Sequence, residues 1–144
     1  MKKFILILVV LCVVFMGCSN PAGGIDDSPA ARLQGRWYVY GNNGPTANHY
    51  IEFSGNIMRE YMNIGDRQWN DSGPFTCTET VITVDLFGDY YGDGNPFYRT
   101  FILHYTIDEE TIRGITYPNV LRWNSSDFWP EGGSWIKLDT PLQR

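Results

Sequence analysis

The side chains best suited to acid–base or metal chemistry in this chain are two histidines and a scatter of carboxylates. His49 and Glu52 form the nearest such pair, three positions apart. In an extended strand this spacing puts the two side chains on opposite faces, so they cannot both ligate one metal ion. His104, the other histidine, has no cysteine near it in the sequence. We therefore expect no metal site.

A second group of oxygen-bearing side chains lies in the turn-rich stretch Gly88–Pro96. Asp89 and Asp93 are spaced as in part of a calcium-binding loop. Such a loop needs oxygen ligands at alternate positions and a closing glutamate. Tyr91 and Thr100 occupy two of the positions where those ligands belong. We therefore interpret the stretch as a connection between strands.

The sequence has neither the Gly-x-Ser-x-Gly elbow of many hydrolases nor a glycine-rich phosphate loop. A catalytic carboxylate pair would need folding to bring together carboxylates that are distant in sequence, such as Glu52, Glu60 and Asp85. An enzyme, a hydrolase or an isomerase, needs one of these carboxylates or a histidine facing inward beside a cavity. We expect no catalytic residue and no cofactor, and keep an enzyme as a third hypothesis.

The overall composition narrows the class of protein that these residues belong to. The chain has 144 residues, a net charge of −5, 43% hydrophobic residues and 15% aromatic residues. The length suits a single domain, and the apolar content argues against disorder. An acidic chain without a basic stretch repels phosphate groups, so nucleic-acid binding is not expected.

The N-terminal segment has the pattern of an export signal. Lys2 and Lys3 precede an apolar run, Phe4–Met16, that contains no polar residue. The run has the length of a signal-peptide core and is shorter than the roughly 20 residues that cross a bilayer. The sequence therefore predicts a signal peptide at residues 1–17.

The end of this signal, Phe15-Met16-Gly17-Cys18, resembles the lipobox of bacterial lipoproteins. That resemblance implies cleavage after Gly17, acylation of Cys18 and a tether to a lipid bilayer. Two or three acyl chains hold a protein firmly at a membrane surface. Phe15 departs from the family, in which leucine is commonest at this position. Ser19 stands where aspartate would signal inner-membrane retention, so the cell envelope, and the outer membrane in particular, is the expected location. The alternative is an ordinary secretory signal.

The composition of the segment that follows the lipobox indicates a tether. Residues 18–32 are rich in Gly, Pro, Asp and Ser, which favours a flexible linker, and the folded domain is predicted at residues 33–140. Since Cys12 leaves with the signal and Cys18 carries lipid, only Cys77 remains, so no disulfide within the chain is expected. We interpret Cys77 as a small buried hydrophobic residue.

The sequence of the domain predicts β-strands. Gly, Pro, Asn and Asp interrupt it every 8 to 12 residues, and no helical periodicity appears from Leu33 onward. Alternation supports this reading: Phe101, Leu103 and Tyr105 share one face of a strand. Short connections favour an antiparallel up-and-down meander, and eight strands can close into a barrel without free edges. The predicted strands are 35–40, 49–53, 57–64, 74–78, 81–87, 97–107, 111–117 and 134–138, with loops at 65–72, 88–96 and 118–132.

The start of the first strand, Leu33-x-Gly35-x-Trp37, resembles the opening of lipocalins, and more closely that of small bacterial lipocalin-like domains. The final aromatic strand, Ser134–Leu138, is similar to that family too. The resemblance implies an all-β, eight-stranded lipocalin-like barrel in which Trp37 packs across the closed end. In the family a basic residue near the last strands often stacks on this tryptophan, and Arg122 and Lys137 are both candidates.

The aromatic residues suggest two binding functions. The first hypothesis is a monomeric, non-catalytic binding protein that holds a small apolar or amphipathic ligand inside the barrel, as barrels with apolar mouths do. The second is a protein-interaction or inhibitor module that uses aromatic loops and has no internal cavity. The residues expected to line the ligand site are Tyr61, Phe75, Val84, Phe101, Leu103 and Tyr105. The residues expected in the interaction loops are Tyr90, Tyr91, Tyr98, Phe128 and Trp129.

Overall fold

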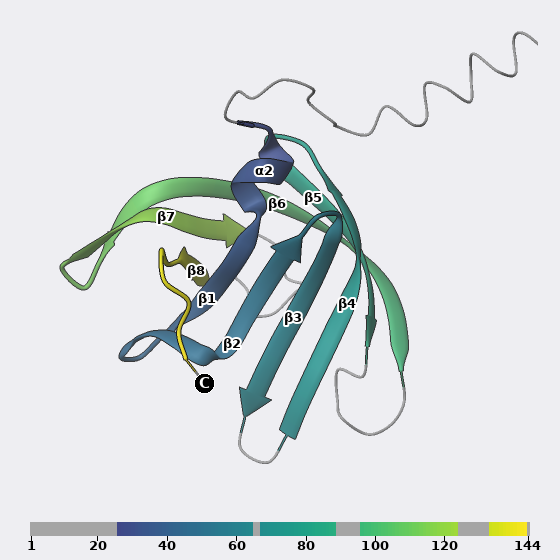
Figure 1. Ribbon diagram of the computed structural model, residues 1–144, viewed down its shortest axis with the longest axis horizontal. Coiled ribbons are helices and arrows are strands. Elements are labelled where there is room, and N and C mark those ends of the chain that lie inside the picture. Colours follow the sequence, from purple (N-terminus) through teal and green to yellow (C-terminus); the bar gives the residue numbers. More distant parts are fainter. Residues whose placement is uncertain (1–25, 65–66, 89–95, 124–132, 144) are drawn as a thin grey trace, which may run out of the picture.

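The protein is a closed barrel of eight antiparallel strands, β1 to β8, in which each strand pairs with the next and β8 returns to β1. The predicted up-and-down barrel is therefore confirmed. We analysed a computed structural model, which describes residues 26–64, 67–88, 96–123 and 133–143. Figure 1 shows the wall formed by β1 to β4 and the short helix α2 at one end of the barrel, which we call the closed end. The elements are α2 (Pro29–Leu33), β1 (Gly35–Gly41), β2 (Gly44–Ser54), β3 (Ile57–Ile64), β4 (Arg67–Cys77), β5 (Val81–Gly88), β6 (Phe97–Ile112), β7 (Ile115–Trp123) and β8 (Ser134–Lys137).

Two strands begin earlier than the sequence predicts. The stretch 65–72 was predicted as a polar loop, but β4 starts at Arg67 and pairs with β3 from Arg67 to Pro74. Likewise, β2 starts at Gly44 rather than at His49. Polar residues such as Asn70 and Ser72 occupy the outward positions of β4, which water solvates, so this strand needs no continuous apolar pattern.

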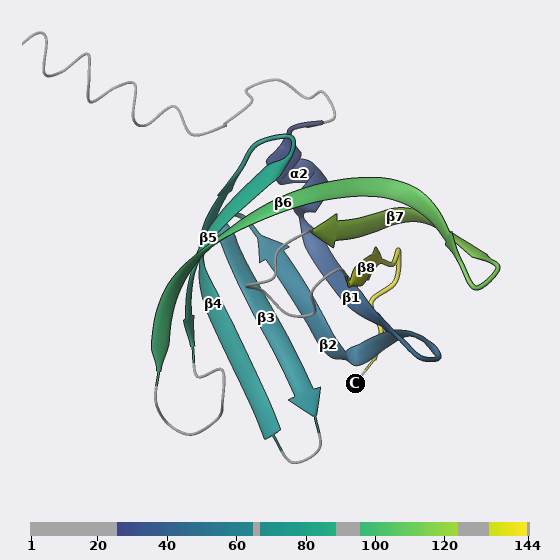
Figure 2. The same cartoon turned by 180° about the vertical axis from the view of Figure 1, so that it is seen from behind.

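The hairpin of β6 and β7 also differs from the prediction. The turn was expected at residues 108–110, but β6 continues to Ile112 and accommodates those residues by a register shift between Asp108 and Glu110. The chain turns instead at Arg113 and Gly114, whose φ angles are 51° and 81°. Two successive positive φ values suit a tight hairpin between twisted strands. Figure 2 shows the hairpin projecting beyond the barrel wall.

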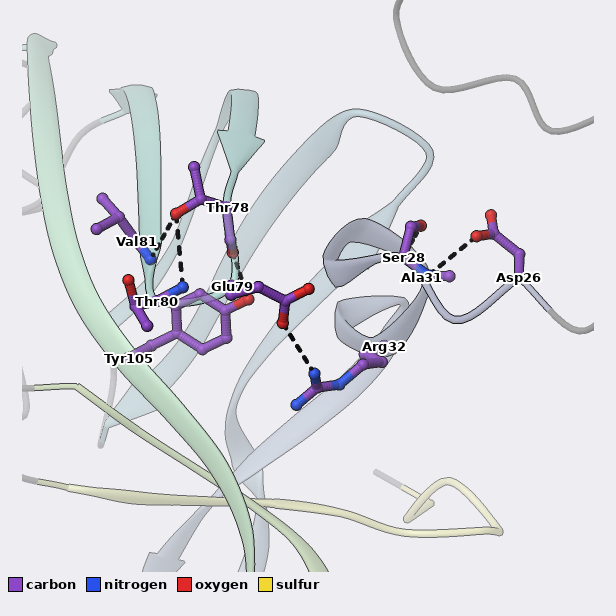
Figure 3. A network of polar contacts seen from close by, with 9 residues as sticks. All are labelled: Asp26, Ser28, Ala31, Arg32, Thr78, Glu79, Thr80, Val81 and Tyr105. Atoms are coloured by element: carbon purple, nitrogen blue, oxygen red, sulfur yellow. Dashed lines mark hydrogen bonds and ion pairs between the residues drawn. The ribbon is translucent and has the colours of Figure 1, made fainter.

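The helix α2 lies within the segment that was predicted to be a flexible tether, so the folded part starts about four residues earlier than expected. The Ser28 side chain caps the helix by accepting a hydrogen bond from the Ala31 N–H at 3.2 Å. Arg32 forms an ion pair with Glu79 at 3.2 Å, which joins the helix to the β4–β5 turn (Figure 3). Leu33 is fully buried in the main core. These contacts seal the closed end.

The β4–β5 turn is held by its own hydrogen bonds. Thr78 Oγ1 accepts from the Val81 N–H at 3.2 Å, and the Tyr105 hydroxyl donates to the Thr78 carbonyl at 2.8 Å (Figure 3). Tyr105 therefore extends from β6 to the closed end, where its only polar side-chain group satisfies a backbone carbonyl.

Most of the buried apolar side chains among the described residues belong to two clusters, one inside the barrel and one outside. The inner cluster runs from Leu33 and Trp37 at the closed end to Trp123 and Trp135. The outer cluster consists of Tyr38, Tyr50 and Tyr61, and the C-terminal residues Leu138 and Leu142 pack against it. The C-terminal segment thus covers part of the outer face of β1 and β2, a path that Figure 1 shows in yellow.

Two glycines make room for close packing between strands. A Cβ atom on Gly73 would lie 1.5 Å from the Asp85 carbonyl oxygen, and one on Gly88 would lie 1.6 Å from Asp71 Oδ1. Both distances are far too short for any side chain. Gly73 therefore allows β4 to approach β5, and Gly88 leaves the space that the Asp71 carboxyl group fills.

Within these described ranges, no helical segment has the length and apolar character needed to cross a membrane.

Candidate functional site

Three acidic or basic residues lie buried among the described residues: His49, Glu60 and Asp71, with 4%, 2% and 1% of their surfaces exposed. Glu60 on β3 pairs in register with Ile51 on one side and with Asp71 on the other. Side chains that are directly paired point to the same face of a sheet, and Ile51 belongs to the inner core. His49 is two residues before Ile51 on β2, so it points inward as well. We call these three residues the lumen site.

A short hydrogen bond joins two members of the lumen site. His49 Nε2 and Glu60 Oε1 are 2.8 Å apart, and both side chains are almost completely buried. Burial raises the pKa of the Glu60 carboxyl group, and this effect outweighs the opposite effect of the His49 hydrogen bond. Glu60 therefore holds its proton to higher pH than an exposed glutamate.

Indole rings form the wall beside the lumen site. The rings of His49 and Trp135 meet edge to face with centroids 4.9 Å apart. Trp123 follows, with its ring centroid 5.1 Å from that of Trp135. Within the part of the chain that the structure describes, the fully buried Trp135 Nε1 has no hydrogen-bond acceptor. The lumen thus combines apolar walls with a small number of polar atoms.

Five of the six residues predicted to line a ligand site do face the interior. Tyr61 is the exception, because it lies in the outer tyrosine cluster, where its ring stacks on Tyr50 at 5.1 Å. The prediction for Tyr61 is wrong because its neighbour Glu60 takes the inward position of β3. Phe75, Val84, Phe101, Leu103 and Tyr105 are all part of the inner core, with between 0% and 7% of their surfaces exposed.

The described residues also form hollows at the surface of the barrel. One of about 560 Å³ lies between α2 and β4 and includes Phe75 and Cys77 in its wall. A hollow of about 370 Å³ is lined by Arg36, Tyr38 and Glu52, among others. Another of about 310 Å³ is lined by Glu52 and Tyr61 and also by Glu60 and Asp71 of the lumen site. Cys77 is half-buried and packs against the inner core, in agreement with its interpretation as a small hydrophobic residue.

Of the residues predicted to form interaction loops, the structure describes Tyr98. It is 69% exposed and is paired on the outer face with Phe87, which is 57% exposed. Tyr90, Tyr91, Phe128 and Trp129 lie outside the described residues, as do Cys18 and the aspartates of the calcium-like stretch, Asp89 and Asp93.

The structure of the closed end shows which basic residue, Arg122 or Lys137, stacks on Trp37. Trp37 is fully buried, and its Nε1 donates a hydrogen bond to the Leu33 carbonyl at 2.7 Å. Lys137 Nζ lies 5.3 Å from the Trp37 ring centroid, a cation–π distance. Arg122 instead binds Glu110, with Nε 2.8 Å from Oε2. Lys137 is therefore the basic residue that stacks on Trp37.

The carboxylates that the sequence singled out do not meet. Glu52 is paired with Arg36 at 2.8 Å, and Asp85 accepts a hydrogen bond from Thr100 at 2.5 Å, while only Glu60 points inward. His104 is exposed. Over the described ranges, no three His, Cys, Asp or Glu side chains are arranged to hold a metal ion.

Sequence reasoning missed the lumen site for two reasons. Asp71 lay in a stretch predicted as a loop, and His49 was considered only with Glu52, a neighbour in sequence. The alternation of β3 carries a usable signal, because Glu60 stands between Met58 and Met62, which occupy the inward positions of that strand.

No family model, curated protein or solved structure matches this chain. The lumen site must therefore be interpreted from its own geometry. A hydrogen-bonded histidine and glutamate are chemically able to transfer a proton and to form hydrogen bonds with polar groups. Because both side chains are almost completely buried, a small molecule could reach them only by entering the barrel.

Proposed function

We propose that this protein is a lipoprotein of the cell envelope, tethered to a bilayer, with the outer membrane favoured, through acylated Cys18. Its barrel, which we regard as lipocalin-like, binds a small amphipathic molecule without transforming it, and acts as a monomer. The observation that carries the proposal is the lumen site, in which His49, Glu60 and Asp71 lie buried on the same face of the sheet as the inner apolar core.

Burial of ionisable groups opposes folding unless they are paired or neutralised, and such buried groups are concentrated at functional sites. An apolar interior with a few converging polar groups is the usual design of a small-molecule site. The aromatic walls would hold the apolar part of the ligand, and the lumen site would bind its polar part.

Binding can be tested with N-phenyl-1-naphthylamine, an uncharged apolar fluorophore, titrated into the intact protein. We expect a saturable rise in fluorescence with a Kd in the micromolar range. Two variants on β6 form a matched pair: Phe101→Ala alters an inward ring, and Tyr98→Ala alters an outward ring that is 69% exposed. Phe101→Ala should change the Kd at least fivefold and Tyr98→Ala should not. The absence of saturable binding, or equal effects of the two variants, would contradict the proposal.

The tether is tested separately by Cys18→Ala. Without the acylated cysteine, the protein should move from the membrane fraction to the soluble fraction and lose the mass of its acyl chains, because acyl burial supplies the anchoring energy. Continued membrane fractionation of the variant would rule out this form of attachment.

A second candidate function, protein docking, is favoured by the exposed pair Phe87 and Tyr98. Aromatic rings exposed side by side are typical of interaction surfaces. The double variant Phe87→Ser/Tyr98→Ser should no longer capture the protein that the wild-type chain retains from envelope extract. Ile115→Ser, at a residue 56% exposed on the projecting hairpin, serves as the control. Unchanged capture by the double variant would exclude this surface.

A further inference from the structure

Exposed apolar side chains gather on the outer face of β5 and β6. Among the described residues four large hydrophobic side chains are exposed, and three of them, Phe87, Tyr98 and Ile102, lie on these two strands. Phe87 pairs directly with Tyr98, and Ile102 is four residues beyond Tyr98 on β6, so all three point to the same side of the sheet. They are 57%, 69% and 60% exposed. We call the outward positions of Val81–Phe87 and Tyr98–His104 the β5–β6 face.

The β5–β6 face carries little charge. Asp85 is its only acidic residue, and no lysine or arginine occupies an outward position in these two ranges. Thr100 donates a hydrogen bond to the Asp85 carboxylate at 2.5 Å, which supplies part of what water would otherwise provide. By contrast, the outer face of β1–β3 carries Arg36, Glu52 and Arg59, which are paired across neighbouring strands. The barrel wall is thus apolar outside β5 and β6 and charged outside β1–β3.

The proposed tether brings a bilayer within reach of the β5–β6 face. The described chain begins at Asp26, beside α2 (Figure 3), and Cys18 is eight positions earlier. Because an extended chain spans at most about 3.6 Å per residue, Cys18 lies no more than about 29 Å from Asp26. The Arg32–Glu79 ion pair joins α2 to the β4–β5 turn, where β5 begins. At about 3.3 Å per residue, the outward positions of β5 extend about 20 Å from that turn, a length comparable to the reach of the tether.

The residue types on the β5–β6 face suit the interface between lipid and water. Tyrosine is enriched there because its ring is apolar and its hydroxyl is polar, as at Tyr98. Phe87 and Ile102 supply apolar area that the boundary between headgroups and acyl chains accepts. The chain has a net charge of −5, which gives no attraction to anionic lipids. Contact through this face therefore depends on apolar burial and should be insensitive to salt.

We propose, on the basis of the tether proposed above, that the β5–β6 face is a membrane-contact surface. The acylated protein lies with this face against the lipid bilayer, and the side chains of Phe87, Tyr98 and Ile102 enter the headgroup region. The acyl chains supply the attachment, and the face supplies the orientation. The charged outer side of β1–β3 is consequently turned toward water.

Nitroxide labels on the acylated protein test this orientation in vesicles of phosphatidylethanolamine and phosphatidylcholine. Thr100→Cys places a label within the face, and Asn48→Cys places one on β2, which is four strands from β6 in either direction around the barrel. Both positions are exposed, and Cys77→Ser removes the Cys77 thiol from both proteins. Power saturation measures the accessibility of each label to O₂, which concentrates in lipid, and to a water-soluble nickel chelate. The ratio of O₂ to nickel accessibility should be at least threefold higher for the Thr100→Cys label.

Unlabelled variants provide a second measurement that does not require Cys77→Ser. The Cys18→Ala chain lacks the tether, so the face alone should give weak, salt-independent partition into the same vesicles at high lipid concentration. The triple variant Phe87→Ser/Tyr98→Ser/Ile102→Ser should reduce that partition at least tenfold in sedimentation, because it removes the apolar side chains that enter lipid. Ile115→Ser, at a residue 56% exposed on the β6–β7 hairpin, is the matched control and should leave the partition unchanged.

The possible results separate this proposal from the tether on which it rests. If the acylated protein does not stay with the vesicles, the tether fails and the proposal fails with it. If the protein stays but the two labels are equally accessible to the nickel chelate, or the triple variant partitions like the Ile115→Ser control, the tether stands and membrane contact through this face is refuted.

Two further results would assign the β5–β6 face to another occupant and overturn the proposal. In the first, the Thr100→Cys label becomes shielded from the nickel chelate only when envelope proteins are added to the vesicles, which indicates a protein partner. In the second, light scattering shows that the Cys18→Ala chain is a dimer in solution and that the triple variant is a monomer, which indicates a second copy of this chain.

Discussion

The substitution Leu33→Ala tests whether the helix ahead of β1 belongs to the folded barrel. Leu33 ends α2, has no exposed surface and packs in the inner core beside Trp37. The substitution leaves the backbone carbonyl of residue 33 in place, so the 2.7 Å hydrogen bond from Trp37 Nε1 persists. The change therefore isolates the packing of one side chain at the closed end.

The expected loss follows from the burial of that side chain. Truncating a fully buried leucine to alanine costs about 2–5 kcal/mol, part of it from lost transfer energy and part from the cavity left behind. Small domains have a total stability of about 5–15 kcal/mol. At about 4 °C per kcal/mol, the melting temperature should fall by about 8–20 °C.

The assay is urea unfolding of the full chain, followed by tryptophan fluorescence. The adjacent variant Arg32→Ala is the control, since it removes an ion pair with Glu79 whose side chains are 41% and 69% exposed. Exposed pairs contribute about 0–1 kcal/mol, so this variant should unfold almost like the wild type. If Leu33→Ala and Arg32→Ala differ by less than about 0.5 kcal/mol, the helix is not part of the cooperative unit, and the reasoning fails.

Two further predictions concern packing and pH. Gly73→Ala should lower the free energy of unfolding by about 3 kcal/mol or more, because its Cβ meets the Asp85 carbonyl oxygen. Gly55→Ala is the control: with a φ of 61° and open space around it, it should cost only about 1 kcal/mol. Equal losses of the two variants in thermal unfolding would contradict the packing argument. Burial raises the pKa of Glu60 above its ordinary value of 4.5, so the folded state retains this proton to higher pH than the unfolded chain. The contribution of the Glu60 proton to stability is therefore complete below the unfolded pKa and is lost as pH rises through the folded pKa. Unfolding measured from pH 4 upward should therefore show Glu60→Gln losing less stability with rising pH than the wild type, and parallel curves would show that Glu60 is not the group responsible.

The strand pattern could be predicted from the sequence wherever alternation was strong. Ile82, Val84 and Leu86 alternate with more exposed residues in β5, and all three are fully buried. The prediction failed where a strand has polar outward residues, as in β4, or passes through a bulge, as β6 does at Asp108–Glu110. Local propensity is weak in such places, and pairing with a neighbouring strand decides the structure.

Local sequence patterns could not predict the lumen site. His49, Glu60 and Asp71 come from three strands, and their approach depends on the register that pairs Glu60 with both Ile51 and Asp71. A shift of one residue in that register would turn every one of these side chains to the other face. Tyr61 illustrates the same dependence, since it was assigned to the interior and lies in the outer tyrosine cluster.

The sequence by itself determined the class of fold, because alternating apolar residues and regularly spaced turn residues leave few solutions other than a closed antiparallel sheet. It also placed Trp37 at the start of the first strand. Tertiary structure decided which polar side chains the barrel encloses, that Lys137 rather than Arg122 covers Trp37, and that α2 closes one end. The physical reason is that alternation states which residues share a face, while closure and register state which face is inside and which residues meet there.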